Sequence, residues 1–162
     1  MKRPLLLITF LLSSCLSQPK IGETIHPSPG DWAGRGVCIF KSENYEKLCS
    51  YSVSIFERNS TPQLVVSLKK ITREADGHPT WKIIDTVALP RYLAGKIIES
   101  GICRYNEKAD DSIVAVVDSY GENSPEYIRA QGWAYKVDES SGKFMKINAD
   151  AVDCINTAIG AD

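Results

Sequence analysis

Apolar and polar residues alternate over much of the chain, and a period of two predicts half-buried β-strands. The clearest example is the stretch in which Tyr51, Val53 and Ile55 alternate with serines. Similar patterns, one of them a β-branched run, predict strands at residues 50–55, 63–71, 81–89 (interrupted by Asp85), 113–117 and 133–137. A glycine-bearing stretch, residues 138–143, separates the last strand from apolar residues 144–147, so this unit is predicted to be a hairpin.

Helical patterns are weak by comparison. Short helices are predicted at residues 124–131, where Ser124 and Pro125 resemble a helix start, and at residues 150–159. Residues 91–101 are ambiguous between a turn of helix and a strand that covers residues 96–105. About seven or eight short strands with tight connections therefore predict a mainly β fold, an antiparallel β-sandwich or barrel-like sheet with at most one or two short helices.

The N-terminus has the three-part pattern of a secretory signal: Lys2 and Arg3, then the apolar stretch 4–12, then small residues. That stretch is far shorter than the roughly 20 residues of a membrane-spanning helix. Residues 12–15, Leu-Ser-Ser-Cys, resemble the lipobox of bacterial lipoproteins. Ordinary cleavage after Ser17, or a buried N-terminal element, is the alternative interpretation.

The lipobox resemblance implies cleavage before Cys15, which then carries the lipid that anchors the protein to a membrane. Several acyl chains together make a stable anchor. Leu16, and not aspartate, would follow the lipidated residue, which by family analogy implies the outer membrane and its periplasmic face. The predicted organisation is a signal peptide at 1–14, an acylated N-terminus and flexible tether at 15–31, and one β domain at 32–162. The tether is expected to bury little surface.

Setting Cys15 aside leaves four cysteines, an even number in a chain exported to an oxidising compartment. Four cysteines allow three pairings. We favour Cys38 with Cys49 and Cys103 with Cys154, because the first two flank a predicted strand-turn-strand. Zinc is the rival interpretation, but the chain has no CxxC spacing and its histidines are distant from the cysteines in sequence.

The charge balance changes the picture of possible partners. The formal net charge of −1 becomes −3 once Lys2 and Arg3 leave with the signal peptide. A near-neutral chain without a basic stripe argues against a nucleic-acid partner. It also argues against attachment to anionic lipid by a polybasic segment.

No catalytic motif stands out. His26 and His78 each precede a proline in a predicted tether or turn, and Ser67 with Lys70 matches an SxxK spacing without its partner motifs. No cofactor is expected. A charged loop could supply oxygen ligands for calcium, although its spacing fits no known motif; its residues are Asn106, Glu107, Asp110 and Asp111. The three tryptophans, Trp32, Trp81 and Trp133, are interpreted as core residues, with a sugar- or peptide-binding face as the alternative.

A disulfide-bonded β domain without catalytic motifs predicts binding without turnover. The leading hypothesis is a periplasmic lipoprotein that binds a protein partner, as an inhibitor or immunity protein; a structural or assembly lipoprotein of the envelope is the alternative. A third hypothesis is an enzyme whose catalytic motifs are unfamiliar. Binding energy usually concentrates in Trp, Tyr and Arg. The candidate partner-binding residues are therefore Tyr120, Tyr127 and Arg129.

Overall fold

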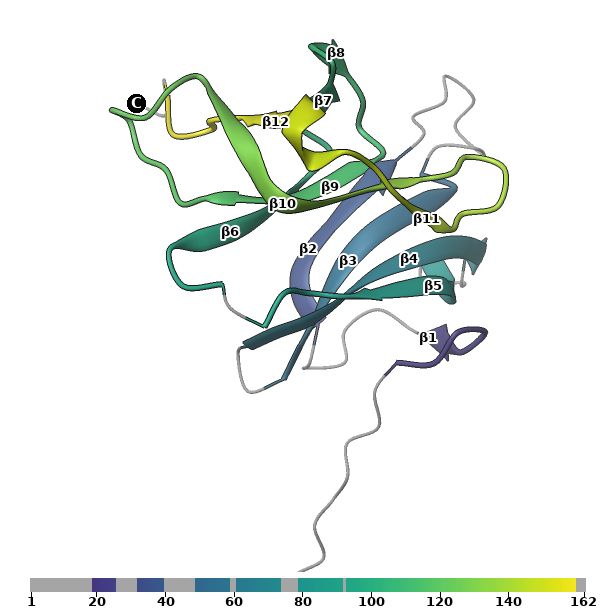
Figure 1. The fold of residues 1–162 in the computed structure, drawn as a ribbon. Coiled ribbons are helices and arrows are strands. Elements are labelled where there is room, and N and C mark those ends of the chain that lie inside the picture. The colour runs from purple at the N-terminus through teal and green to yellow at the C-terminus, as the bar shows by residue number, and fades with distance from the viewer. Residues whose placement is uncertain are drawn as a thin grey trace, which may run out of the picture.

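The computed structural model describes residues 19–25, 32–39, 49–58, 61–73, 79–91 and 93–159. Over these residues the chain forms two antiparallel sheets of five and seven strands, which confirms the mainly β, sandwich-like class (Figure 1). The strands are β1 (Thr24–Ile25), β2 (Trp32–Ile39), β3 (Tyr51–Arg58), β4 (Thr61–Arg73), β5 (Pro79–Ala88), β6 (Lys96–Ser100), β7 (Cys103–Tyr105), β8 (Lys108–Ala109), β9 (Ile113–Asp118), β10 (Tyr127–Val137), β11 (Phe144–Lys146) and β12 (Val152–Ile155).

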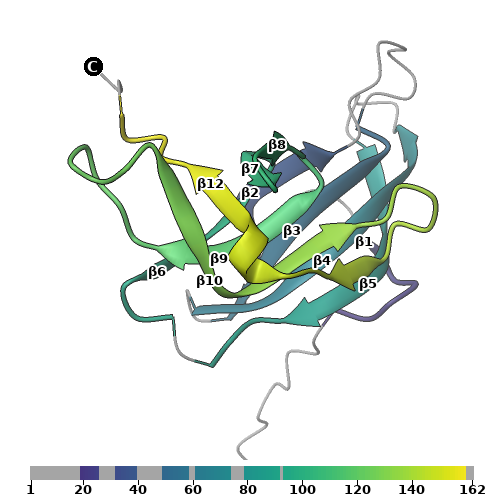
Figure 2. The same ribbon diagram turned by 45° about the horizontal axis from the view of Figure 1, so that its top comes forward.

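The later strands of the chain, β6 to β12, form a sheet that is separate from the one formed by β1 to β5. The five-stranded sheet has the order β1-β5-β4-β3-β2, and the larger sheet has the order β6-β9-β10-β12-β7-β8, with β11 added beside β10. Strand β10 is long and has a bulge between Ala130 and Ala134, where Gly132 adopts a φ of +71°. Its first residues pair with β12 and its last residues pair with β11, while β9 pairs with β10 on both sides of the bulge, so the larger sheet folds over itself (Figure 2).

Strand β9 lies between two hydrophobic cores. Val114 and Val116 pack in a cluster with residues of the five-stranded sheet, among them Val53 and Val65. The alternate residues of β9 pack in a second cluster with Val152, Cys154 and Cys103 of β12 and β7. Because both faces are covered, five consecutive residues of β9 are buried, as expected of a strand that reads as a near-continuous apolar run.

The serine-rich face of β3 differs from the prediction of a half-buried strand. Ser52 and Ser54 are buried, and Ser52 Oγ donates a hydrogen bond to the Val37 carbonyl at 3.0 Å. Phe56 continues this face and packs in a third cluster with neighbours on β4 and β5. The prediction was wrong here because small hydroxyl residues can be buried when their hydroxyls find backbone partners.

Both predicted helices are wrong. Residues 127–131 belong to β10, where Ile128 and Ala130 point into a core and Arg129 and Gln131 point outward. The segment predicted as helix 150–159 holds only the end of a 3₁₀ turn, Ala149–Ala151, which Asn148 caps, followed by β12. Alternate burial along β12 indicates that period two outweighs the local helical tendency. The ambiguous stretch before Tyr105 forms β6 and β7.

Part of the predicted tether belongs to the domain. Residues 19–25 are described, and Thr24 and Ile25 of β1 pair with Lys82 and Trp81 of β5. Ile25 also packs against the third core cluster. Within residues 19–25, Ile25 packs against a core cluster while residues 20–24 stay exposed, so the segment is attached at β1 by backbone pairing and one apolar side chain.

Both favoured disulfides are confirmed. Cys38 bonds to Cys49, and Cys103 bonds to Cys154 with a Cα–Cα distance of 3.9 Å. The second bond joins residues that lie directly opposite each other in the β7–β12 pair. It closes a long sequence separation of 51 residues, which in the chain-entropy account stabilises the fold by about 4 kcal/mol.

The predicted hairpin is confirmed as β10–β11, and polar side chains hold it against the five-stranded sheet. Asp85 Oδ2 accepts a hydrogen bond from Phe144 N at 2.9 Å, and buried Ser67 donates from Oγ to the Gly142 carbonyl. Gly142 has a φ of +72°, and a Cβ there would lie 2.4 Å from the Tyr51 ring. The hairpin thus needs glycine at this contact.

Candidate protein-binding face

Two of the three predicted binding residues lie on one outward face of the larger sheet. Tyr127 and Arg129 alternate along β10 with the buried Ile128 and therefore point away from the core. Arg129 lies directly opposite Asp153 of β12. Asp153 lies in turn opposite Arg104 of β7, so these side chains form a row across three strands.

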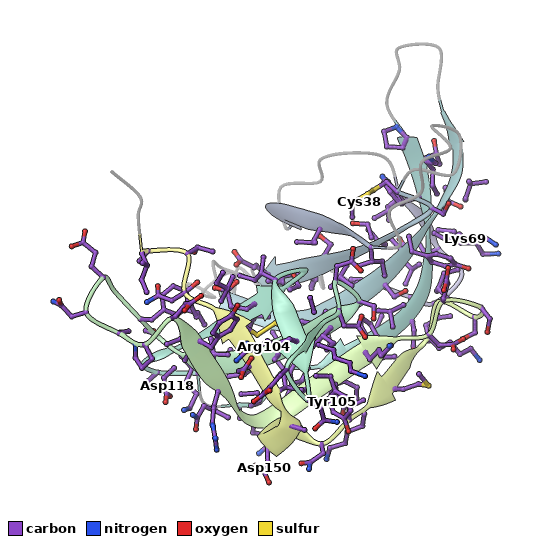
Figure 3. All side chains as sticks on the ribbon, turned by 90° about the horizontal axis from the view of Figure 1, so that it is seen from above. Cys38, Lys69, Arg104, Tyr105, Asp118 and Asp150 are labelled. Atoms are coloured by element: carbon purple, nitrogen blue, oxygen red, sulfur yellow. A yellow bond between two sulfur atoms is a disulfide. The ribbon has the colours of Figure 1, made fainter. Side chains whose placement is uncertain are left out.

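Arg104 links this row to Tyr127. Its guanidinium makes a bidentate contact with the Asp153 carboxylate, with Nη2 donating to Oδ2 at 3.0 Å and Nε donating to Oδ1. The guanidinium carbon lies 3.3 Å from the centroid of the Tyr127 ring, a cation–π contact. The hydrogen bonding of its guanidinium to the Asp153 carboxylate is the main reason that the pKa of Arg104 is raised. Figure 3 looks onto this face, with Arg104 near its centre.

We name the surface formed by Arg104, Tyr127, Arg129 and Asp153 the arginine–tyrosine face. Two open grooves flank it. One, of about 520 Å³, is lined by Arg104, Tyr127 and Ile155 together with residues 101–103 and 109–111. The other, of about 310 Å³, is polar and is lined by Asn106, Glu107, Arg129 and residues 150–153. Arg104 therefore lines one groove and Arg129 lines the other.

Sequence reasoning missed Arg104 and Asp153, although the sequence holds a usable signal. Each residue is the neighbour of a cysteine in the Cys103–Cys154 disulfide. In antiparallel strands joined at these cysteines, the residue after the first lies opposite the residue before the second. The pairing of Arg104 with Asp153 could have been inferred once the strands were assigned.

Tyr120 does not join the arginine–tyrosine face. Its ring packs against the core cluster on the other side of β10, and its hydroxyl donates to Glu99 Oε1 at 2.6 Å and lies 3.1 Å from Thr157 Oγ1. Burial and the Glu99 carboxylate raise the pKa of Tyr120. Its side chain therefore holds the loop between β9 and β10 in place.

The residues of the acidic loop considered for calcium are engaged in a turn and in other contacts. Asn106 and Glu107 both have positive φ and form the turn between β7 and β8. Asp110 accepts hydrogen bonds from Ser112 and from Lys136, whose Nζ lies 2.5 Å away. Burial raises the pKa of Asp110, but these hydrogen bonds outweigh it and hold the pKa below its ordinary value. Within the described ranges no group of three or more His, Cys, Asp and Glu side chains could hold a metal ion.

The tryptophans whose side chains are described and the serine of the SxxK spacing lie in or against the core. Trp133 is buried and donates from Nε1 to the Ala88 carbonyl at 3.2 Å, which fits a core role. Trp81 is partly buried against the third core cluster. Ser67 is a buried strand residue whose hydroxyl is engaged by the hairpin. Cys15, His26, His78 and the Trp32 side chain lie outside the described residues.

Comparisons of the chain with protein-family models, with curated proteins and with solved structures found no match. Among the described residues, no helix is both long enough and apolar enough to cross a bilayer.

Proposed function

We propose that this chain is a lipoprotein of the bacterial envelope, anchored through Cys15 in the outer membrane and facing the periplasm, that binds a protein partner as an inhibitor or immunity protein. The lipobox-like residues 12–15 support the anchor. The two disulfides support an oxidising compartment. Neither observation bears on the partner.

The observation that carries the binding proposal is the stacking of Arg104 between Tyr127 and Asp153. Arginine and tyrosine, with tryptophan, are enriched among the few residues that contribute most of the binding energy of a protein interface. The bidentate contact and the ring hold a long, flexible side chain in one arrangement before any partner arrives. Since ordering a side chain on binding costs roughly 0.5–1.5 kcal/mol, a side chain that is already ordered favours tight binding.

The test is capture of partners from detergent-solubilised envelope with the intact lipidated protein. Tyr127→Ala and Arg104→Lys should each weaken capture by about 2 kcal/mol or more, because interface hot spots are of this size. Arg104→Lys keeps the charge and loses the bidentate contact, so it separates geometry from charge. Arg129→Ala should weaken capture as well, and Arg91→Ala, which removes an exposed arginine elsewhere, is its matched control.

Several outcomes distinguish the candidates. One soluble protein, captured by the wild type and lost in the face variants, supports an inhibitor or immunity protein. Capture of a membrane-embedded complex favours the assembly alternative. Turnover of a cell-wall, lipid or peptide substrate by the pure protein would overturn the binding hypothesis.

A further inference from the structure

The chain joins the five-stranded sheet through a closed turn that presents an apolar side chain to solvent. Glu23 N donates to the Lys20 carbonyl at 3.0 Å, and Gly22 supplies the positive φ of +88° that this turn needs. Gly22 N and the Glu23 carbonyl both bond to the backbone of Ile83, so the turn is fixed on β5. At its tip, Ile21 is 63% exposed, more than the other exposed large hydrophobic side chains of the described residues.

Lysines gather on the strands beside this turn. Lys82 lies opposite Thr24 of β1 and, on its other side, directly opposite Lys69 of β4. Lys69, Lys82 and Lys20 are all exposed. Like charges directly opposite in a sheet are unfavourable, and an anionic surface in contact with them would offset that cost.

The number of residues between anchor and turn limits how far the domain can move from the membrane. Lys20 lies only five positions after Cys15, and a fully extended chain spans at most about 3.6 Å per residue, or roughly 18 Å here. With the lipid of Cys15 in the bilayer, Ile21 must stay close to the head groups. This step rests on the anchor of the proposed function.

We propose that the domain docks on a lipid surface with anionic head groups through Ile21, Lys20, Lys69 and Lys82. The apolar tip enters the interface and the lysines contact the head groups, while the acyl anchor provides most of the attachment. The turn and β1 lie at the lower end of the molecule in Figure 1, and β7, β8 and β12 lie at the upper end. Docking therefore turns the arginine–tyrosine face away from the membrane and toward a soluble partner.

The experiment uses the full lipidated chain in vesicles of phosphatidylethanolamine and phosphatidylglycerol, with or without nitroxide-labelled lipid. A fluorophore is attached through Ile21→Cys or, as the matched control at the opposite end, through the exposed Lys108→Cys. Nitroxide lipid should quench the fluorophore at position 21 and leave the fluorophore at position 108 bright. Each lysine at an anionic surface contributes about 1 kcal/mol, or about fivefold. Adding Lys69→Glu and Lys82→Glu to Ile21→Cys should thus lower the ratio of docked to undocked domain by about 25-fold or more.

The outcomes separate this proposal from the anchor itself. Vesicles that float with the protein, without a difference in quenching between positions 21 and 108, would overturn the docked orientation and leave the anchor intact. Unchanged quenching after both lysine reversals would overturn the role of the lysines. Failure of the wild type to float would overturn the anchor, and the docking proposal with it.

Discussion

Replacing Asp85 with alanine should separate the β10–β11 hairpin from the five-stranded sheet. Asp85 is the one residue that interrupts the apolar pattern of residues 81–89, and its carboxylate accepts two backbone hydrogen bonds. Oδ1 accepts from Thr86 N and Oδ2 accepts from Phe144 N, each at 2.9 Å. The second bond crosses between sheets, beside the contact from Ser67 to Gly142.

The size of the effect follows from these two contacts. A hydrogen bond to a charged group contributes about 1.5–3 kcal/mol, and an amide left without a partner inside the protein costs about 1–3 kcal/mol. Because Asp85 and Phe144 are only partly buried, water can replace part of the loss. We expect Asp85→Ala to lower the free energy of unfolding by about 2–4 kcal/mol and Asp85→Asn, which keeps one neutral acceptor, by about half as much.

Urea unfolding followed by tryptophan fluorescence is a suitable assay, since the indole of Trp133 is buried and bonded to the Ala88 carbonyl on β5. The matched control is Asp118→Ala, which removes a 55% exposed carboxylate paired with Lys96 at 2.7 Å. Such a surface pair contributes at most about 1 kcal/mol. If Asp85→Ala shifts the urea midpoint no more than Asp118→Ala does, at an unchanged slope, the proposed role of Asp85 is refuted.

Four further predictions follow from the anchor, the disulfide, β1 and the hairpin loop. Cys15→Ser should abolish incorporation of an alkyne fatty acid in cells, and equal labelling of both proteins would place the lipid elsewhere. Replacing both Cys103 and Cys154 with serine should lower the free energy of unfolding by about 4 kcal/mol, and a loss below about 1 kcal/mol would contradict the chain-entropy argument. A chain that starts at Trp32 lacks β1 and should lose about 2 kcal/mol or more, because part of the apolar surface of Trp81 and Ile83 becomes exposed; an unchanged thermal midpoint would show that β1 contributes nothing. Hydrogen bonds from Ser140 and Ser141 lower the pKa of Asp138 from 3.8 to about 2, so its stabilising contribution is present above pH 3.8 and is lost as the pH falls toward 2. Asp138→Asn should flatten the pH dependence of stability in that window, and parallel curves for the two proteins would exclude this role.

Period-two alternation predicted the strands well because burial of alternate residues is what forms them. It failed where a strand is buried on both faces, as in β3, since small serines there look like solvent-facing residues. It also failed around residues 124–131, where Ser124 and Pro125 resemble a helix start but Ile128 and Ala130 alternate into a core. Local capping signals carry about 1 kcal/mol, and the packing of a long strand outweighs them.

The candidate site was predicted in part for a similar reason. Tyr127 and Arg129 could be chosen by residue type and by their place between two strands. Arg104 comes from a strand that is distant in sequence from Tyr127. Its role depends on the register of β7 against β12, which only the assembled sheet defines. Tyr120 was chosen by the same residue-type argument but lies away from the arginine–tyrosine face, because residue type alone does not say on which side of a sheet a side chain lies.

The support beneath the arginine–tyrosine face gives the binding proposal a further consequence. The two strands that carry Arg104 and Asp153 are joined by the Cys103–Cys154 disulfide directly beneath these side chains, on the core side of the sheet. Loss of that bond would loosen the register that places the guanidinium against the carboxylate and the Tyr127 ring. Stability and partner capture should therefore fall together when the disulfide is removed. Substitution of Arg104 should lower capture with a much smaller effect on stability, because its contacts lie on the outer surface. This difference separates a face that is rigid because of its fold from one whose side chains merely happen to be exposed.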